Sequence, residues 1–329
     1  MTTVMPIQAT LVMEDAQLDL GRGLAPLNLE PMTRFRHVGG SVSRVDDLLA
    51  PEASRRVVLS KDAKLLAATR DLRHVVAADG DDLILIGDHV RRLRSGRADS
   101  ATFLPGGRLL VTAASVQTAT WHGRTYEQRG IHRVLLLDLA GEMLDEREVP
   151  EVVDAGAFAS AHPADGSMIV EFGMGQDGSE IYRIDVGGDQ IALDHVLQNV
   201  VACGFSPDGE RLLVLPHPSF PSNPSALRWP GLARCGEVTS SSTITSEGAA
   251  YDHYGCYLAS DRVLLKTVEH GLVLGNRDLD QLVPIELPGI PPIGETFDIG
   301  LILGINRRRF AAALWDDGYN RTTVWTLPD

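Results

Sequence analysis

The chain is poor in positive charge. It carries 30 lysine and arginine residues against 44 aspartate and glutamate residues, so its formal net charge at pH 7 is −14. A nucleic-acid-binding surface needs clustered positive charge, because much of its affinity comes from the release of counterions. We therefore expect no DNA or RNA partner. The two short arginine-rich runs, 91–97 and 307–309, are interpreted as solvated strand faces or turns.

Lysine in particular is rare, and the three lysines are Lys61, Lys64 and Lys266. The arginine bias, together with abundant alanine, leucine, aspartate and glycine, is typical of a GC-rich bacterial genome. We use this pattern only to expect a bacterial source, since it says nothing about chemistry.

Cysteines and long apolar runs are also scarce. The three cysteines, Cys203, Cys235 and Cys256, contain no C-x-x-C pair, so they define neither a disulfide framework nor a zinc site. No apolar run reaches the ~18 residues that span a bilayer. The N-terminus lacks a basic segment followed by an apolar core, the mark of a secretory signal. We expect a cytoplasmic monomer with reduced thiols, outside the membrane, with no cofactor and no metal ion.

Helical periodicity is missing, whereas turn residues are abundant. We find no amphipathic pattern of ten or more residues that would predict a helix. Glycine numbers 32 and proline 18, and aromatic residues make up only 5% of the chain. Hydrophobic residues at 44% and charged residues at 22% are typical of a soluble globular protein. These features together favour an all-β fold with many tight turns.

A turn motif repeats along the sequence. In its clearest copy, Phe205-Ser206-Pro207-Asp208-Gly209 precedes the apolar run 212–215. Proline suits the second position of a tight turn and glycine supplies a positive φ, so the unit reads as strand, turn, strand. Seven copies end 43–59 residues apart, at Ala16, Ala63, Gly107, Gly166, Gly209, Gly255 and Arg307. A period of this length with several strands predicts a β-propeller.

Further strands complete each unit. Val134–Asp138 and Ile181–Asp185 read as third strands, and 142–149 and 190–196 as fourth strands. We predict one domain, residues 1–329, that is a seven-bladed β-propeller of four-stranded antiparallel blades. Eight blades are disfavoured, and six remain open if the first copy is not a full blade.

The pattern resembles the WD-repeat and TolB-like propellers, through turns such as Ser206–Gly209 and third strands such as Leu135–Asp138. The chain departs from the strict WD repeat, because no Gly-His pair opens a unit and its one Trp-Asp pair, Trp315-Asp316, follows a second strand. The Asp–His network of those repeats is therefore not carried over.

The two ends of the chain are expected to meet. The last copy ends on its third strand, 324–327, and the segment Thr3–Ile7 is free to supply the fourth. Such pairing closes a ring and removes exposed strand edges. We predict that deleting residues 1–7 destabilises the fold by several kcal/mol, from about four strand hydrogen bonds at ~0.5–1.5 kcal/mol each and lost apolar burial.

The resemblance implies that binding concentrates on one face, around the central channel, where the loops between second and third strands lie. Three long loops are predicted there, at about Ser115–Ile131, Pro216–Ala226 and Trp315–Arg321. Loops carry function disproportionately, and exposed Trp, Tyr and Arg are common binding anchors. The predicted binding residues are Trp121, His122, Arg124, Tyr126, Phe220, Glu269, Trp315, Asp317 and Tyr319.

Two functions remain open. The leading one is a recognition module that binds a protein, a peptide or a small ligand on this face. The alternative is an enzyme, a lyase, cyclase or hydrolase of bacterial secondary metabolism, with a pocket at the channel mouth. Its acid–base residues would be His217, His270, Glu171 and Tyr126. His162 and His253 are expected in turns on the opposite face, with structural roles.

One further motif is discounted. Gly173–Gly178 matches G-x-G-x-x-G, but a dinucleotide site needs these glycines to open a helix. The following segment, Ser179–Asp185, reads as a strand, so we interpret the glycines as a loop.

Overall fold

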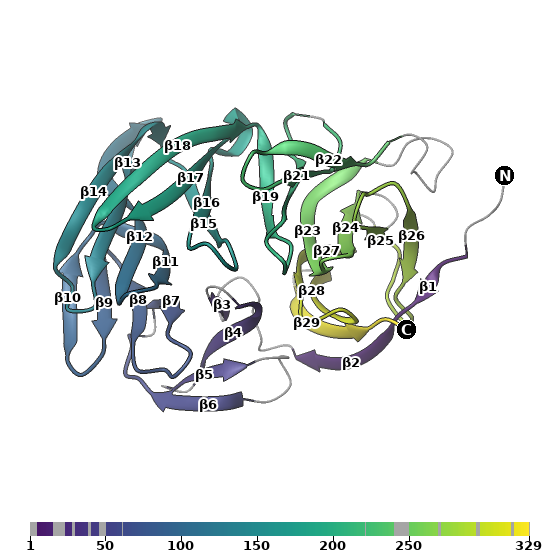
Figure 1. The fold of residues 1–329 in the computed structure, drawn as a ribbon, viewed down its shortest axis with the longest axis horizontal. Helices are drawn as coiled ribbons and strands as arrows, with labels where there is room; N and C mark the ends of the chain where they lie inside the picture. The colour runs from purple at the N-terminus through teal and green to yellow at the C-terminus, as the bar shows by residue number, and fades with distance from the viewer. Residues whose placement is uncertain are drawn as a thin grey trace. The chain divides into compact units, whose positions relative to one another are not determined.

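A computed structural model describes residues 5–15, 24–27, 30–38, 41–45, 51–60, 62–220, 222–239, 250–268, 271–293, 297–316 and 319–328. Regular structure in this part of the chain is almost entirely β, as Figure 1 shows, with one short 3₁₀ helix, η1 (Gly175–Asp177). The strands form seven sheets, in which strands that follow one another in sequence pair antiparallel. The predicted all-β class and four-stranded antiparallel units are therefore confirmed.

The chain divides into two compact units, which we name by their main segments. The 22–198 unit comprises Arg22–Val45 and Ala50–Gln198, and the 199–329 unit comprises Met1–Gly21, Asp46–Leu49 and Asn199–Asp329.

The 22–198 unit holds four sheets. The first sheet consists of β3 (Leu24–Leu27), β4 (Glu30–Val38), β5 (Ser41–Val45) and β6 (Pro51–Arg56). The second consists of β7 (Lys64–Ala68), β8 (Val75–Asp79), β9 (Asp82–Ile86) and β10 (Val90–Arg94). The third sheet consists of β11 (Arg97–Leu104), β12 (Arg108–Trp121), β13 (Arg124–Asp138) and β14 (Met143–Val153). The fourth consists of β15 (Gly156–Ala161), β16 (Met168–Gly173), β17 (Ser179–Gly187) and β18 (Gln190–Gln198).

The 199–329 unit holds three sheets, two of which take a strand from the N-terminus. The first is β19 (Val200–Phe205), β20 (Arg211–Pro216), β21 (Ser225–Arg228) and β22 (Ala233–Glu237). The second is β23 (Tyr251–Ala259), β24 (Arg262–Thr267), β25 (Gly271–Asn276) and β26 (Leu282–Glu286), with β1 (Ile7–Gln8) added in parallel. The third is β27 (Phe297–Gly304), β28 (Arg309–Asp316) and β29 (Tyr319–Thr326), with β2 (Thr10–Asp15) added antiparallel.

The N-terminal strand was placed wrongly by the sequence. Thr10–Asp15, not Thr3–Ile7, pairs with β29 and completes the last sheet. Ile7 and Gln8 instead pair with Ile285 and Glu286 of the preceding sheet, whereas Thr3 and Val4 lie outside the described residues. The motif copy at Met13–Ala16 is wrong for the same reason, because Met13–Asp15 belong to a strand.

Four of the seven predicted turns join the first and second strands of a sheet, at residues 105–107, 162–166, 206–209 and 305–308. The copy that ends at Ala63 lies instead between β6 and β7, and the turn of its sheet is at 69–74. The copy at Tyr251–Gly255 lies inside β23, and the turn there is Ser260-Asp261.

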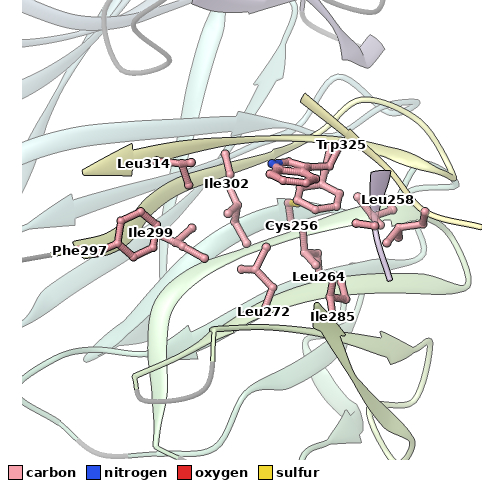
Figure 2. Packing of buried hydrophobic residues seen from close by; sticks show 14 residues of the cluster. Cys256, Leu258, Leu264, Leu272, Ile285, Phe297, Ile299, Ile302, Leu314 and Trp325 are labelled. Atoms are coloured by element: carbon pink, nitrogen blue, oxygen red, sulfur yellow. The ribbon is translucent and has the colours of Figure 1, made fainter. Parts of the chain in front are cut away.

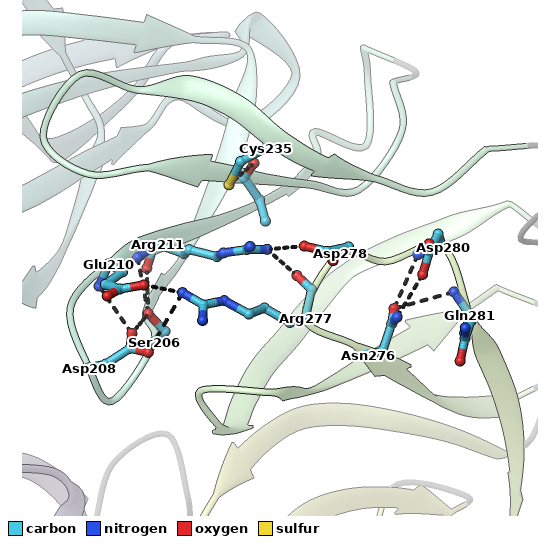
Figure 3. Close-up of polar contacts among 11 residues, drawn as sticks. Ser206, Asp208, Glu210, Arg211, Cys235, Asn276, Arg277, Asp278, Asp280 and Gln281 are labelled. Carbon is cyan, nitrogen blue, oxygen red and sulfur yellow. Dashed lines mark hydrogen bonds and ion pairs between the residues drawn. The ribbon is translucent and has the colours of Figure 1, made fainter.

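The clearest turn is held by its own side chains (Figure 3). Ser206 is fully buried, and its hydroxyl donates to Asp208 at 2.6 Å and accepts from the Arg211 amide at 3.0 Å. Gly209 has φ 74°, and its amide donates to the Ser206 carbonyl at 2.8 Å. Burial alone would raise the pKa of Asp208, but hydrogen bonds from Ser206 and the Glu210 amide outweigh it, so that pKa is lowered. The motif therefore acts through side-chain hydrogen bonds as well as backbone angles.

We expect Ser206→Ala to lower the free energy of unfolding by about 1–3 kcal/mol, because it leaves buried donors and acceptors without a partner. Urea denaturation measures the change. Ser219→Ala, at an exposed position of the same unit, is the control and should stay within about 0.5 kcal/mol of the parent. Equal effects of the two substitutions would contradict the role of Ser206.

One hydrophobic core cluster of the 199–329 unit lies between the β23–β26 sheet and the β27–β29 sheet (Figure 2). It includes Cys256, Leu264, Phe297, Ile299 and Leu314 together with the fully buried Trp325. The Trp325 indole N–H donates to the Thr323 hydroxyl at 2.8 Å, which satisfies its one polar atom. This core fixes the starts of β23 and β27, where an unexpected polar cluster lies.

Candidate functional site

The predicted loop at Ser115–Ile131 is wrong: the structure forms a β-hairpin there. The pairing of β12 with β11 ends at Ala114 opposite Arg97, and the pairing of β13 with β14 ends at Ile131 opposite Val153. Beyond these points β12 and β13 continue to pair, from Val116 opposite Arg129 to Trp121 opposite Arg124. We call residues 116–129 the projecting hairpin.

Two residues, His122 and Gly123, make the turn of the projecting hairpin. Their φ angles are 48° and 74°, and two consecutive positive values define a type I′ turn. This turn matches the right-handed twist of the strands, so it joins them without a loop. A His-Gly pair here replaces the more familiar Asn-Gly signal, which explains why the sequence pointed to a loop.

The base of the projecting hairpin is anchored by ion pairs. Arg129 contacts Asp99, whose side chain is only 8% exposed, at 2.6 Å, and Arg97 contacts Glu127 at 2.6 Å. The Arg129 backbone exchanges hydrogen bonds with Asp154, through the Asp154 amide at 3.1 Å and the Asp154 carboxylate at 3.3 Å. Burial raises the pKa of Asp99 although Arg129 and Lys64 oppose it. These contacts hold the base of the projecting hairpin against the neighbouring residues Asp99, Arg97 and Asp154.

The tip brings several predicted binding residues together. His122, Arg124 and Tyr126 are exposed, Tyr126 at 44%. Trp121 pairs with Arg124, and Ala119 with Tyr126. Positions 124 and 126 therefore share one face of the hairpin by strand alternation. Tyr126 was also predicted to take part in acid–base catalysis, but it lies on this exposed projection.

Two other predicted catalytic residues, Glu171 and His217, belong to different units of the chain. Glu171 is buried in β16 of the 22–198 unit, opposite Phe158. His217 is buried just after β20 in the 199–329 unit, where its Nδ1 accepts from the Ser219 amide at 3.2 Å. Phe220, 38% exposed, bridges back to His217 with its ring centroid 5.6 Å away. His217 and Phe220 therefore shape a turn.

The remaining predicted binding residues lie near the ends of β28 and β29. The expected loop at Trp315–Arg321 is wrong, because β28 runs to Asp316 and β29 starts at Tyr319, its partner. Trp315 pairs with Asp298, is 43% exposed, and covers Gly300 so closely that a Cβ there would lie 2.8 Å from the indole. Glu269, His270 and Asp317 lie outside the described residues.

The sequence missed a polar cluster around Lys266, which is 98% buried in β24. Its ammonium lies 2.6 Å from the Asp252 carboxylate and 2.8 Å from the Asp298 carboxylate. Asp252 comes from β23 and Asp298 from β27, so the contacts link two neighbouring sheets. The same ammonium lies 5.3 Å from the centre of the Tyr254 ring.

His253 extends this cluster to the surface of β23. Its Nδ1 lies 2.5 Å from an Asp252 oxygen that also accepts from the His253 backbone amide at 2.7 Å. The imidazole is 34% exposed, and its ring centre lies 4.1 Å from that of Tyr254. The prediction that His253 lies in a turn is therefore wrong. His162 does lie in a turn, where its buried Nδ1 accepts from the amides of Ala164 and Asp165.

The surroundings shift the pKa values of Asp252 and of two tyrosines of β23. Burial alone would raise the pKa of Asp252, but hydrogen bonds from His253 and Lys266 outweigh it and hold that pKa well below its usual range. Burial raises the pKa of the Tyr254 phenol, and the Asp252 carboxylate adds to this effect. Burial also raises the pKa of Tyr251 to about 12. At neutral pH the cluster therefore combines an ionised Asp252 with neutral phenols.

One sequence signal could have located this cluster. Lys266 is one of three lysines in the chain and directly follows the apolar run Val263-Leu264-Leu265. A lysine at the end of a buried strand is rarely buried without a partner. The identity of its partners was not accessible, because Asp298 belongs to the neighbouring sheet, and the packing of the two sheets is set by tertiary structure.

Within the described ranges, no group of three or more histidine, cysteine, aspartate or glutamate side chains is placed to hold a metal ion. The same residues include no helix of the length and apolarity that crossing a bilayer requires.

Comparison with known proteins identifies the fold. No protein-family model matches the sequence, and no curated protein matches it. The β-propeller domain of Cps50 (Swd1) from Myceliophteria thermophila superimposes with a TM-score of 0.56 at 16% identity, over 97% of this chain and 100% of that one. YCF48 bound to a D1 peptide gives 0.55 at 10% identity, over 99% and 98%. The fold is a β-propeller.

A third propeller neighbour is Kuenenia stuttgartiensis hydrazine synthase, with a TM-score of 0.50 at 13% identity, over 93% of this chain and 97% of that one. The resemblance to WD-repeat and TolB-like propellers is confirmed at the level of the fold. At these identities the similarity concerns the fold alone, so any function of this propeller has to be argued from its own residues.

Proposed function

We propose that this propeller is a recognition module that binds a protein or peptide through the projecting hairpin. The observation that carries the proposal is the extension of β12 and β13 beyond both neighbouring strands, with an exposed tip. An isolated two-stranded ribbon is marginally stable in water, and it gains stability when a partner covers it.

The chemistry of the tip fits a binding role. Arg124 and Tyr126 are exposed on one face, and side chains of these types dominate binding energy at protein interfaces. Both edges of the hairpin also offer unpaired backbone groups, to which an extended peptide can add as a strand. The YCF48 propeller was solved with a bound D1 peptide, which supports peptide recognition as a use of this fold.

We further propose that the seven sheets are the blades of a single ring formed by residues 1–329 and closed by β2. The supporting observation is that β2 pairs with β29 in the same sheet, so that the two ends of the chain meet. In this proposal β2 takes the closing role that the sequence analysis assigned to Thr3–Ile7.

The proposal predicts that peptides selected by this protein bind the hairpin tip. A peptide-display library is panned against the whole protein, and the dissociation constants of the enriched peptides are then measured by calorimetry. We expect Arg124→Ala and Tyr126→Ala each to weaken binding by about 30-fold, the effect of losing an interface hot spot. Because both side chains are exposed, the free energy of unfolding should change by less than about 0.5 kcal/mol.

Two controls sharpen the test. Arg73→Ala removes an exposed arginine from the turn between β7 and β8 in the same unit and should leave peptide affinity unchanged. Replacing residues 117–128 by Asn-Gly shortens the hairpin while keeping Arg129 and its contact with Asp99, and it should abolish binding. Peptides that bind the shortened variant as tightly as the parent would refute the proposal.

A further inference from the structure

We propose that His132 makes the attachment of the projecting hairpin sensitive to acid: its neutral ring keeps the base of the hairpin closed, and protonation of the ring opens it. Such a switch regulates the binding site proposed above, so its functional meaning rests on the binding role of the hairpin. His132 lies in β13 of the 22–198 unit, three residues beyond Arg129.

His132 lies where a four-stranded sheet narrows to two strands. It pairs with Ala114, the residue at which β12 makes its last pair with β11. The residue before it, Ile131, makes the last pair between β13 and β14, opposite Val153. A change that displaces the His132 side chain therefore acts on the junction between the sheet and the projecting hairpin.

The side chain of His132 is fully buried, and neither ring nitrogen has a hydrogen-bond partner among the described residues. The ring packs edge-to-face against Phe172 of β16, with the two ring centres 5.0 Å apart. A neutral imidazole has one donor and one acceptor, and here both are unused. A protonated ring would bring two unpaired donors and a positive charge into the same space, which costs much more.

The nearest charged groups do not offset this cost. Arg129, on the same strand, places a second positive charge near the ring. Asp154, in the link between β14 and β15, is the negative charge that acts on the ring, and it is exposed to water. Arg129 is itself paired with Asp99 of β11 at 2.6 Å.

Two titratable groups lie on the strands beyond Phe172. Glu171 adjoins Phe172 in β16, and strand alternation directs it to the opposite face of that strand. Tyr182 of β17 contacts the Phe172 ring, and its hydroxyl donates to the Pro150 carbonyl at 3.1 Å. Neither side chain therefore serves as a counter-charge for a protonated His132.

The neutral state of the ring follows from these surroundings. Burial and, to a smaller extent, the Arg129 guanidinium lower the pKa of His132 from 6.5 to about 4. Asp154 and the Ala155 backbone, which approaches the ring without completing a hydrogen bond, act more weakly in the opposite direction. In an open state the ring is in water and titrates near pH 6.5. The stability that depends on the neutral ring is thus fully present above about pH 6.5 and is lost as the pH falls towards 4.

Opening of the hairpin base exposes His132 without unfolding the whole unit. The contacts to be broken are the Arg129–Asp99 ion pair and the hydrogen bonds between Arg129 and Asp154. Local openings of this kind have free energies below that of global unfolding. Asp99 opposes the switch in part, because burial raises its pKa and its protonation therefore favours the closed state in acid.

Hydrogen exchange of the whole protein, followed by NMR, tests the switch without any ligand. The informative amides are those of Arg129 and Asp154, which are hydrogen-bonded across the base. Their protection factors, which correct for the intrinsic pH dependence of exchange, should fall about 50-fold from pH 7 to pH 4.5, as pKa values of about 4 closed and 6.5 open require. Protection factors that stay constant over this range would overturn the proposal.

Variants identify the titrating group. His132→Phe keeps an aromatic ring against Phe172 but cannot be protonated, so the acid-dependent fall in protection should disappear. His132→Met should have the same effect and serves if phenylalanine strains the packed core. His195→Gln is the matched control, since it removes a histidine of β18 in the same unit, where His195 pairs with Glu180, and it should keep the parental fall. A fall of parental size in both His132 variants would refute the role of this residue.

Asp99→Asn separates the carboxylate from the imidazole. It weakens the contact with Arg129 and removes the opposing titration, so protection should be lower at every pH and should still fall in acid. Loss of the fall in this variant would assign the switch to Asp99 and refute the proposal. The Cε1–H signal of His132 gives a direct titration, in which an apparent pKa near 6.5 in the parent would also refute it.

The exchange measurements distinguish failure of the switch from failure of the binding role. Constant protection together with peptides that bind the hairpin tip would refute the switch alone. An acid-dependent fall without any tip-binding peptide would support the switch and refute the binding role alone. Where both hold, a bound peptide should slow exchange of the Asp154 amide at pH 4.5, because it stabilises the closed state. An unchanged rate would refute regulation of binding by this switch.

Discussion

Lys266→Met should lower the free energy of unfolding by about 3–5 kcal/mol, the usual cost of breaking a buried ion pair. The substitution keeps most of the side-chain volume but removes the ammonium that contacts Asp252 and Asp298. Asp252 is only 18% exposed, so its carboxylate would remain buried with one partner fewer. Urea denaturation at pH 7 measures the loss.

The same variant has a characteristic pH dependence. An unfolded aspartate titrates near pH 3.9, whereas Asp252 in the folded protein has a pKa well below its usual range, held there by His253 and Lys266 against burial. The stability that this lowered pKa confers is fully present above about pH 4, and it is lost as the pH falls towards the folded pKa. In Lys266→Met the pKa of Asp252 is lowered less than in the parent. The difference in stability between parent and variant should therefore shrink below about pH 4.

Lys64→Met provides the control. Lys64 is exposed in β7 and contacts the Asp99 backbone carbonyl at 3.2 Å, so its replacement should cost less than about 1 kcal/mol. A loss below 1 kcal/mol for Lys266→Met, or a difference from the parent that stays constant down to pH 3, would contradict the role assigned to the cluster.

Local turn chemistry made much of this fold predictable. A turn such as Ser206–Gly209 is specified by its own residues, since Ser206 and Asp208 hydrogen-bond within it and Gly209 has a positive φ. No distant partner is needed, and the sequence alone therefore located four of the seven first turns.

Glycine also caused the clearest error. Tyr251–Gly255 was predicted to be a turn, but Gly255 lies in β23. This strand position requires glycine because a Cβ there would lie 2.8 Å from Leu215 and 3.2 Å from the Leu264 carbonyl. Glycine is needed here for close packing against neighbouring strands and not for a turn, and a single sequence does not reveal such packing. The tyrosines beside it, Tyr251, Tyr254 and Tyr257, favour a strand and were the better signal.

The two candidate sites differ in the same way, since one depends on residues close in sequence and the other on residues far apart. The tip residues Arg124 and Tyr126 are close in sequence, so the sequence analysis placed them together although it expected a loop there. The Lys266 cluster depends on residues from three strands, and Asp298 lies 32 positions from Lys266. Its assembly is decided by how the β23–β26 and β27–β29 sheets pack around Trp325, a long-range outcome that turn and period signals do not contain.

The largest effect is expected from removal of the N-terminal strands. Deleting residues 1–15 should lower the free energy of unfolding by about 4–7 kcal/mol. This sum counts about five strand hydrogen bonds, at ~0.5–1.5 kcal/mol each, and the apolar burial of Ile7 and Ala9 in the core. The structure gives five residue pairs between β2 and β29, including Leu11 opposite Trp325. Thermal and urea denaturation measure the loss.

Shorter deletions locate the stabilising residues. Deleting residues 1–6 leaves β1 and β2 intact and should change the free energy of unfolding by less than about 0.5 kcal/mol. Deleting residues 1–7, the change that the sequence singled out, adds only the loss of Ile7 and its pairing with Ile285. It should therefore cost about 1–2 kcal/mol, less than the several kcal/mol expected when Thr3–Ile7 was taken for the closing strand.

Addition of the missing strand in trans tests the pairing itself. The 1–15 deletion leaves β29 with an unpaired edge, which a synthetic peptide of residues 5–15 can fill as an added strand. The peptide should restore most of the lost stability, and the gain should rise with the logarithm of the peptide concentration above its Kd, as for any ligand of the folded state. A peptide with Leu11 and Met13 replaced by proline lacks the backbone amides at two of the five positions that pair with β29 and should fail. Equal rescue by both peptides would show that β2 stabilises the chain by some means other than pairing with β29.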